Sequence, residues 1–247
     1  MIIFDNNSNT FYSTLINDQT YLSGFGNKKA GSSNRITEVI GYFDSIHLEY
    51  KKIVDLEQIH SANATEFISI NNDKIIKIND TDGVVTNEAD TVLYVKTADC
   101  VPMLFSEKKL GIVGASHQGW RGSLKRLPQK MISKMASMGA DINSICVAIG
   151  PAINSCCYDI DDDRYYAFLE EFDGYSEKIF SFRKGKRHMS LSHLNYLLLL
   201  ESGIKKSNID YFPFCTYCDK DNFYSYRRDN KKSYGEMLSF IYKYGQV

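Results

Sequence analysis

The chain has 247 residues, of which 43% are apolar and 24% are charged, and its formal net charge is −1. This composition is typical of a globular protein and excludes a disordered chain. The near-neutral charge gives no general attraction to nucleic acid or to anionic lipid. No apolar stretch approaches the roughly 20 residues of a membrane span. We therefore expect no nucleic-acid partner and no membrane partner.

The N-terminal residues and the cysteines indicate the cellular compartment. The first residues, MIIFDNN, lack the basic and long apolar regions of a secretory signal. Six cysteines are too few for a disulfide scaffold in a chain of this length. We expect reduced thiols, a cytoplasmic protein, and a monomer or small homo-oligomer. No repeat or Pro/Gly/Ser-rich linker divides the chain, so we expect one domain over residues 1–247.

The strands are predicted from apolar and β-branched runs. Residues 6–34 are polar and turn-rich, which predicts short strands and loops. Longer runs predict strands over residues 52–56, 91–96, 101–105, 110–115 and 145–149. Strands or a short helix are expected over residues 209–212 and 237–242.

The helices are predicted from apolar residues at spacings of three and four. Such a stripe follows Gly122-Ser123 and predicts one helix through Leu124, Leu127, Met131, Met135 and Met138. Pro128 is tolerable only near the first turns of that helix, and Gly139 is a plausible C-terminal cap. Further helices are predicted over residues 36–47, 161–172 and 190–202. Strands and helices alternate, so the fold class is α/β, or α+β with mixed sheets.

Three side chains with metal-binding chemistry follow predicted strands. They are His60, Cys100 and His117. Strand ends meet at a common edge of a sheet, and two histidines with one cysteine form a known catalytic zinc set with an open fourth position. The long gaps between the three are no compact ligand signature. A hydrogen-bonded histidine or a small buried cysteine is the alternative for each.

Several strings in the chain are distinctive as a set. In chain order they are QIHS (58–61), TADCVP (97–102), HQGWRG (117–122), GPAI (150–153), CCY (156–158) and FYSYRRD (223–229). Together they resemble the YfiH/YlmD family, also called the laccase-domain-containing or polyphenol oxidase family. The resemblance runs from about Asn34-Arg35 to Arg228. The segment before Asn34-Arg35 is shorter than the family's Gly/Asn-rich loop, which leaves the substrate contacts of that loop open.

The resemblance implies a fold, a cofactor and an activity. The implied fold has two mixed sheets between layers of helices. The implied cofactor is Zn²⁺, held by His60, Cys100 and His117. The implied activity is phosphorolysis of purine nucleosides, including inosine, adenosine, guanosine and S-methyl-5'-thioadenosine, together with adenosine deamination. The expected partners are therefore a purine nucleoside and phosphate.

Phosphorolysis needs cationic donors for phosphate, and several arginines are candidates. Arg121 lies beside the predicted zinc site, where a bidentate guanidinium can hold phosphate. Arg35, Arg227 and Arg228 are further candidates. An alternative for the Arg227-Arg228-Asp229 run is a solvated turn with a local ion pair of little energetic value.

Asp99 and Cys100 each have two open roles. Asp99 is either a proton relay in deamination or an acceptor that orients a zinc-ligating histidine. Cys100 is either a zinc ligand or the nucleophile of a cysteine hydrolase, with His117 or His60 as its base. The signature of cytidine-type deaminases is absent from the sequence. A copper oxidase is rejected because five histidines cannot build several copper centres. A non-enzymatic partner protein is the remaining alternative.

The other cysteines carry a weaker signal. Cys215-Thr216-Tyr217-Cys218 is a single C-x-x-C pair, and a structural zinc needs a second pair. Cys156 and Cys157 are adjacent, which suits two ligands to one ion poorly. We expect ordinary reduced cysteines here rather than a second zinc site.

Overall fold

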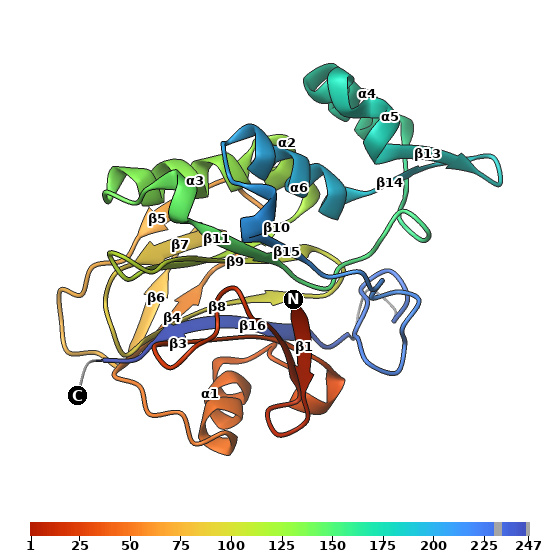
Figure 1. The fold of residues 1–247 in the computed structure, drawn as a ribbon. Helices are drawn as coiled ribbons and strands as arrows, with labels where there is room; N and C mark the ends of the chain where they lie inside the picture. Colours follow the sequence, from red (N-terminus) through yellow and green to blue (C-terminus); the bar gives the residue numbers. More distant parts are fainter. Residues whose placement is uncertain (230–233, 246–247) are drawn as a thin grey trace.

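Two large β-sheets stack face to face in the computed structural model, which describes residues 1–229 and 234–245 (Figure 1). The first sheet contains, in spatial order, β1 (Ile2–Asp5), β2 (Thr10–Ser13), β3 (Tyr21–Gly26), β16 (Met237–Lys243), β8 (Thr91–Thr97), β4 (Lys52–Leu56) and β6 (Ile75–Ile78). The second contains β15 (Ile209–Tyr211), β11 (Cys146–Ile149), β9 (Val101–Glu107), β10 (Ile112–Gln118), β7 (Gly83–Thr86) and β5 (Ala64–Glu66). Both sheets mix parallel and antiparallel pairs.

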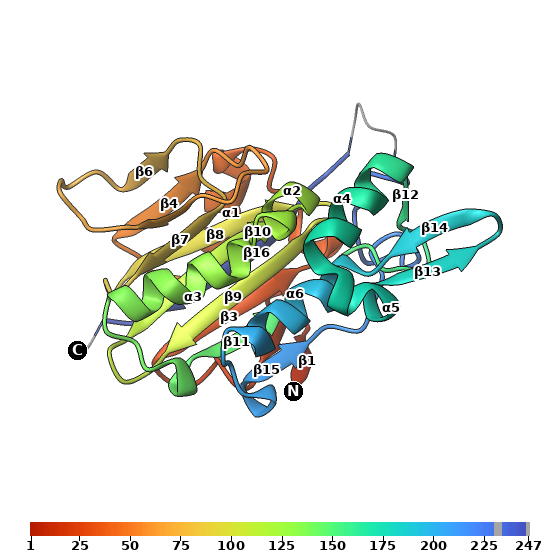
Figure 2. The same cartoon turned by 90° about the horizontal axis from the view of Figure 1, so that it is seen from above.

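Helices cover the outer faces of both sheets (Figures 1 and 2). The first sheet is covered by α1 (Ile36–Ser45), and the second by α2 (Trp120–Leu124), α3 (Leu127–Ser137) and α6 (Leu191–Glu201). To one side lie α4 (Asp162–Phe172) and α5 (Ser176–Ile179) with a small sheet of β12 (Asp159–Ile160), β14 (Lys186–Met189) and β13 (Phe180–Arg183). Short 3₁₀ helices span Lys28–Ala30, Ile142–Ser144, Asp173–Tyr175 and Lys206–Asn208. The expected arrangement of two mixed sheets between helices is confirmed.

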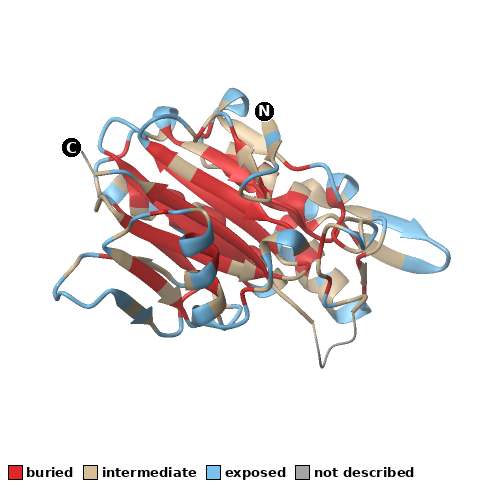
Figure 3. Cartoon of the chain, turned by 90° about the horizontal axis from the view of Figure 1, so that it is seen from below, coloured by how far each residue is buried: buried red, intermediate tan, exposed pale blue. Residues whose placement is uncertain are grey.

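The core has three layers, which follow from the alternation of side chains along the strands. Between the sheets, Phe25 and Leu93 of the first sheet pack with Leu104 of the second. The opposite face of the first sheet, including Tyr94, packs on α1. The opposite face of the second sheet, including Phe105, packs on α3 and α6. The central strands are buried on both faces (Figure 3), and they give the strand ends a rigid base.

One predicted element is wrong. The helix expected from Gly122 to Met138 is two helices, α2 and α3, separated at Lys125-Arg126. Arg126 has a left-handed backbone with φ of 59°. Pro128 is the cause, because inside a continuous helix its ring would clash with the carbonyl of Leu124. Placed in the first turn of α3, Pro128 avoids that clash.

Most other predicted elements agree closely with the structure, but the strand predicted over residues 110–115 is β10 (Ile112–Gln118), so His117 lies within it rather than after it. β4 matches its prediction residue for residue, and α4 and α6 match theirs within one residue at each end. The segment 237–242, left open between strand and helix, is a strand. Among residues 1–229 and 234–245, no helix has the length and apolar character needed to cross a lipid bilayer.

Candidate functional site

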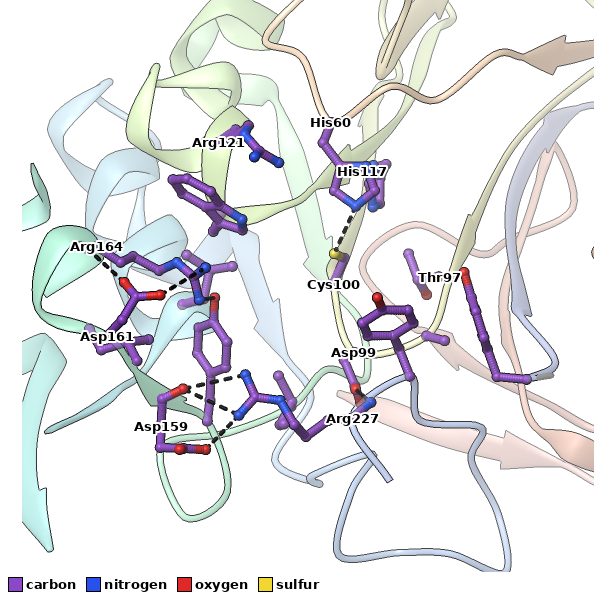
Figure 4. A pocket seen from close by; sticks show the side chains of 18 of the residues that line it. His60, Thr97, Asp99, Cys100, His117, Arg121, Asp159, Asp161, Arg164 and Arg227 are labelled. Atoms are coloured by element: carbon purple, nitrogen blue, oxygen red, sulfur yellow. Dashed lines mark hydrogen bonds and ion pairs between the residues drawn. The ribbon is translucent and has the colours of Figure 1, made fainter. Parts of the chain in front are cut away.

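The three predicted metal ligands meet where the chain crosses from one sheet to the other. His60 lies in the loop from β4 to β5, Cys100 in the turn from β8 to β9, and His117 near the end of β10. One donor atom from each lies within 4.8 Å of the other two. The Cys100 Sγ is 3.9 Å from the His60 Nε2. The two imidazole rings are almost perpendicular, and their centroids are 4.7 Å apart (Figure 4). We call His60, Cys100 and His117 the triad.

Asp82, which precedes β7, holds two members of the triad in place. Its fully buried carboxylate accepts a hydrogen bond from the His117 Nδ1 at 2.7 Å. It also accepts the backbone N–H groups of His60 at 3.1 Å and Ser61 at 2.6 Å. With its Nδ1 bonded to Asp82, His117 has its Nε2 left as the atom that could bind a metal ion. The sequence reasoning missed Asp82.

Two backbone features make room for the triad. His60 has φ of 59° and Asp99 has φ of 85°, a left-handed conformation that residues other than glycine seldom adopt. Such strain persists only where surrounding contacts enforce it, and here the Asp82 carboxylate holds the His60 loop. A Cβ on Gly119 would lie 2.8 Å from the His60 Cδ2. The glycine in HQGWRG therefore lets the His60 ring approach β10.

The triad is an electrostatically coupled group. Burial would raise the pKa of Cys100, but His117 and His60 lower it to about 6. Burial would lower the pKa of His117, but the Cys100 thiolate and Asp82 raise it to about 10. Burial would likewise raise the pKa of Asp82, whereas hydrogen bonds from His117 and Ser61 hold it below its ordinary value. The site therefore favours a thiolate, which is the form of cysteine that binds metals and attacks carbonyls.

Asp99 lies beside the triad but bonds to a different part of the chain. Its carboxylate accepts hydrogen bonds from the Thr216 hydroxyl at 2.7 Å, the Ser225 hydroxyl at 2.9 Å and the Arg227 backbone N–H at 2.7 Å. The histidine-orienting role that was one alternative for Asp99 is filled by Asp82. Asp99 instead connects the loop of residues 216–227 to the turn between β8 and β9.

The four candidate arginines occupy different places. Arg121 lines the pocket, with its guanidinium 4.4 Å from the Trp120 ring centroid. Arg227 also lines the pocket, but its guanidinium is bound to Asp159. The structure does not bring Arg35 and Arg228 to the pocket lining.

Those two arginines bond elsewhere. Arg35 is exposed at the start of α1 and pairs with Glu38 at 2.7 Å. The Arg228 guanidinium donates to the backbone carbonyls of Thr216 at 2.7 Å and Phe223 at 2.6 Å. The expected ion pair of Arg228 with Asp229 is also present. Arg228 thus holds the loop that Asp99 anchors.

The triad opens into a pocket of about 1510 Å³ (Figure 4). Trp120 lies on its wall with the guanidinium groups of Arg121 and Arg164 against its ring, at 4.4 and 4.5 Å. Other lining residues that the sequence reasoning missed are Tyr158, Arg164, Tyr234 and Glu236. Burial raises the pKa of Glu236, although Lys96 and the two triad histidines oppose that rise. Aromatic, cationic and proton-carrying groups thus surround the triad.

Comparison with known proteins supports the resemblance stated above. The family model described as multi-copper polyphenol oxidoreductase laccase matches residues 28–243. Purine nucleoside phosphorylase YlmD of Bacillus subtilis (strain 168) is 34% identical over 165 residues, covering 65% of this chain and 58% of the relative. Adenosine deaminase RL5, from an unknown prokaryotic organism, is 32% identical over 163 residues, covering 66% and 62%. The chain thus matches about three fifths of the length of these two relatives.

Longer matches extend the comparison to most of the chain. Purine nucleoside phosphorylase RP494 of Rickettsia prowazekii (strain Madrid E) is 30% identical over 230 residues, covering 87% of this chain and 91% of the relative. The crystal structure of YlmD from Geobacillus stearothermophilus has a TM-score of 0.86 at 25% identity, covering 99% of this chain and 100% of that one. Bacillus licheniformis hypothetical protein YfiH has a TM-score of 0.80 at 26% identity, covering 91% and 93%. The predicted family and fold are confirmed.

Proposed function

We propose a function from the premise that this chain belongs to the multi-copper polyphenol oxidoreductase laccase family, whose model matches residues 28–243. The proposed function is zinc-dependent phosphorolysis of purine nucleosides to the free base and ribose 1-phosphate, together with deamination of adenosine. The observation that carries the proposal is the triad, three donors within reach of one ion at the wall of a large pocket. Relatives named purine nucleoside phosphorylase and adenosine deaminase support the purine chemistry.

The donor set of the triad fits zinc. Two imidazole nitrogens and a thiolate form a known catalytic zinc set, and the bond from His117 to Asp82 is the support that a metal-bound histidine needs. Three protein donors leave a fourth position toward the pocket. A bound zinc ion supplies Lewis acidity at that position. We assign His60, Cys100 and His117 as its ligands.

Phosphate binding is assigned first to Arg121. Its guanidinium is exposed in the pocket and makes no ion pair with any carboxylate in residues 1–229 and 234–245. Arg227 is already paired with Asp159 at 2.5 Å, and Arg164 lies near Asp161 at 3.7 Å. An unpaired guanidinium can offer two parallel N–H groups to a phosphate. We assign Arg227 a secondary role in phosphate binding, and we assign Arg35 and Arg228 no role in binding phosphate in the pocket.

Purine binding and proton transfer can be assigned to two further residues. Trp120 offers a ring face on the pocket wall, although the two guanidinium groups beside it compete for that face. Glu236 is half-buried in the pocket lining, and burial raises the pKa of its carboxyl, which is the direction that favours a proton donor to a departing purine. Asp99 accepts three hydrogen bonds from residues 216–227, so we assign it to holding that loop rather than to proton transfer.

A second candidate function is a cysteine hydrolase with Cys100 as the nucleophile. The observation that favours it is the pKa of Cys100, lowered to about 6 beside a histidine held by Asp82. Nucleophile, base and orienting acid follow the usual logic of such a site. The copper-oxidase mechanism suggested by the family description remains disfavoured. The chain has five histidines, and only His60 and His117 belong to the donor groups found in the described residues.

The test is a chromatographic assay of the purified, zinc-loaded protein with adenosine, with and without phosphate. Phosphate-dependent adenine reports phosphorolysis, and phosphate-independent inosine reports deamination. Inosine, guanosine and S-methyl-5'-thioadenosine with phosphate extend the same assay. If no nucleoside is converted under any of these conditions by protein that contains zinc at the triad, the proposed function is wrong. Ester or amide hydrolysis by metal-free protein supports the cysteine hydrolase instead.

A further inference from the structure

A second group of metal-binding side chains lies apart from the triad. The thiol sulfurs of Cys156, Cys157, Cys215 and Cys218 all lie within 4.8 Å of one another. We call them the four-cysteine cluster. The Sγ–Sγ distances are 3.6 Å from Cys156 to Cys218 and 3.3 Å from Cys157 to Cys218. None of these residues belongs to the pocket lining.

The sulfur spacing fits one tetrahedral ion. Zinc–sulfur bonds of about 2.3 Å in tetrahedral geometry place neighbouring sulfurs roughly 3.8 Å apart. The Sγ–Sγ distances of 3.6 and 3.3 Å are close to that spacing and well beyond the roughly 2.05 Å of a disulfide. A cubane iron–sulfur cluster would bind each cysteine to a different iron and so separate the sulfurs further. A single ion therefore fits the geometry best.

A turn allows the adjacent Cys156 and Cys157 to serve the same ion. The backbone N–H groups of Cys157 and Tyr158 both bond to the Asn154 carbonyl at 2.9 Å. In a strand, neighbouring side chains point to opposite faces, whereas in a turn of this kind they diverge much less. Adjacent cysteines are expected to suit one ion poorly, but this turn brings both sulfurs within 4.8 Å of those of Cys215 and Cys218.

Backbone contacts hold the C-x-x-C pair against this turn. Ala152 and Cys215 form a parallel bridge, and the Thr216 N–H bonds to the Ala152 carbonyl at 3.1 Å. The Asn154 N–H donates to the Cys215 Sγ at 3.3 Å. The sulfur atoms of metal-binding cysteines accept hydrogen bonds of this kind. The two segments that supply the cysteines are thus brought together by contacts independent of the thiols.

We propose that the four-cysteine cluster is a second metal site, a closed structural Zn²⁺ site. Four thiolates complete the tetrahedral coordination of zinc and leave no position for substrate. Zinc is preferred because tetrahedral sulfur ligation selects zinc or iron, and zinc brings no redox chemistry that the fold would have to control.

The proposed ion would stabilise one wall of the pocket. Thr216, within the C-x-x-C pair, donates to Asp99, and Arg228 binds the Thr216 carbonyl. The same loop delivers the Arg227 backbone N–H to Asp99. Zinc at the cluster would fasten this loop to the 154–158 turn. Its loss should loosen the loop that carries Arg227 while leaving the triad intact.

The test compares zinc content in four versions of the 247-residue protein, purified under reducing conditions. Metal analysis should give two zinc ions per wild-type chain, and one each for Cys218→Ser and Cys100→Ala. The half-buried Cys146 belongs to neither group, so Cys146→Ser is the matched control and should keep two. Cobalt substitution adds a second readout, because a site with four thiolates gives a stronger sulfur-to-cobalt charge-transfer band than one with a single thiolate.

Several outcomes would overturn the assignment. If the wild type contains one zinc ion and Cys218→Ser still contains it, the second site is ruled out and the proposed function still stands. If the wild type contains one zinc ion that is lost in Cys218→Ser but kept in Cys100→Ala, the second site is supported and zinc at the triad is not. Iron in place of zinc, or a disulfide between Cys218 and Cys156 or Cys157 detected by mass spectrometry, contradicts the proposal. Should Cys218→Ser fail to fold, Cys156→Ser at the other exposed position provides the same comparison.

Discussion

The triad and the four-cysteine cluster are two solutions to the problem of gathering metal-binding side chains. The triad sits on the ends of buried strands, is braced by the Asp82 carboxylate, and faces a large pocket with three donors. The cluster sits on two turns, has four donors of one kind, and lies outside the pocket. Open coordination suits catalysis and closed coordination suits structure.

The backbone that carries each site determines what the removal of a metal-binding side chain would do. Strands β8, β9 and β10 are held by the core whether or not an ion is bound, so removing a triad ligand should cost activity and little stability. The loop of the four-cysteine cluster depends on a few backbone bonds and on Arg228. Removing a cluster ligand should therefore cost local order first and activity second.

The largest expected effect is that of Cys100→Ala. This variant should lose nucleoside turnover entirely and lose the triad zinc, because two imidazoles alone hold the ion weakly. Its thermal unfolding should stay close to that of wild-type protein without zinc at the triad, since Cys100 is not part of the apolar core. Metal analysis, the adenosine assay and circular dichroism on the same sample check all three. Wild-type turnover by Cys100→Ala would end the metal-centred account.

Asp82→Asn should have the next largest effect. Loss of the carboxylate that orients a metal-bound histidine costs about 10–100-fold in metal affinity or activity. The matched variant is Asp99→Asn, at the second buried carboxylate near the triad. Asparagine tolerates the left-handed backbone of Asp99. Zinc titration should show weaker binding for Asp82→Asn and unchanged binding for Asp99→Asn. Equal zinc affinity in the two variants would mean that Asp82 does not support the triad.

Strand prediction explains why the triad could be anticipated. Apolar runs located β4, β8, β9 and β10, and strand ends then pointed to His60, Cys100 and His117. The assignment of the three as zinc ligands came from the family resemblance. Their proximity is now a structural observation, while zinc itself is still a proposal.

The missed features depend on information that periodicity does not carry. Asp82 lies next to His117 because β7 pairs with β10 in a register that sets Gly83 opposite Ser116, and register is not readable from one strand. Pro128 is the sequence signal for the break between α2 and α3, because a proline is tolerated only near the first turns of a helix. The sequence favours ordinary reduced cysteines over a second zinc site, because it does not show that a turn carries Cys156 and Cys157 or that their sulfurs lie near those of Cys215 and Cys218.

Arg121→Ala should have a moderate and selective effect. A charge-assisted contact is worth about 1.5–3 kcal/mol, and exposure favours the lower end, so the KM for phosphate should rise about tenfold. Adenosine deamination, which needs no phosphate, should change little. The exposed Arg35 lies outside the pocket lining, and Arg35→Ala is the control that should alter neither reaction. Equal losses of both activities in Arg121→Ala would indicate that Arg121 supports the pocket wall through Trp120.

The smallest expected effect concerns the Cys100 thiolate in protein stripped of metal. The pKa of Cys100 is lowered to about 6 by His117 and His60, against the opposing effect of burial. Its alkylation by iodoacetamide should therefore rise with pH, reach half of its maximum near pH 6 and stay level above pH 7. A thiol of ordinary pKa, about 8.5, is still gaining reactivity there. Because a thiolate of low pKa is also a weaker nucleophile, the rate at pH 7 should exceed that of an ordinary thiol by only about two- to fourfold. Peptide-resolved mass spectrometry separates Cys100 from the other cysteines. A midpoint near pH 8.5 would show that the histidines do not hold a thiolate, and it would count against both the proposed zinc site and the proposed cysteine hydrolase. In a separate control, added zinc should protect Cys100 from alkylation only if the ion binds the triad.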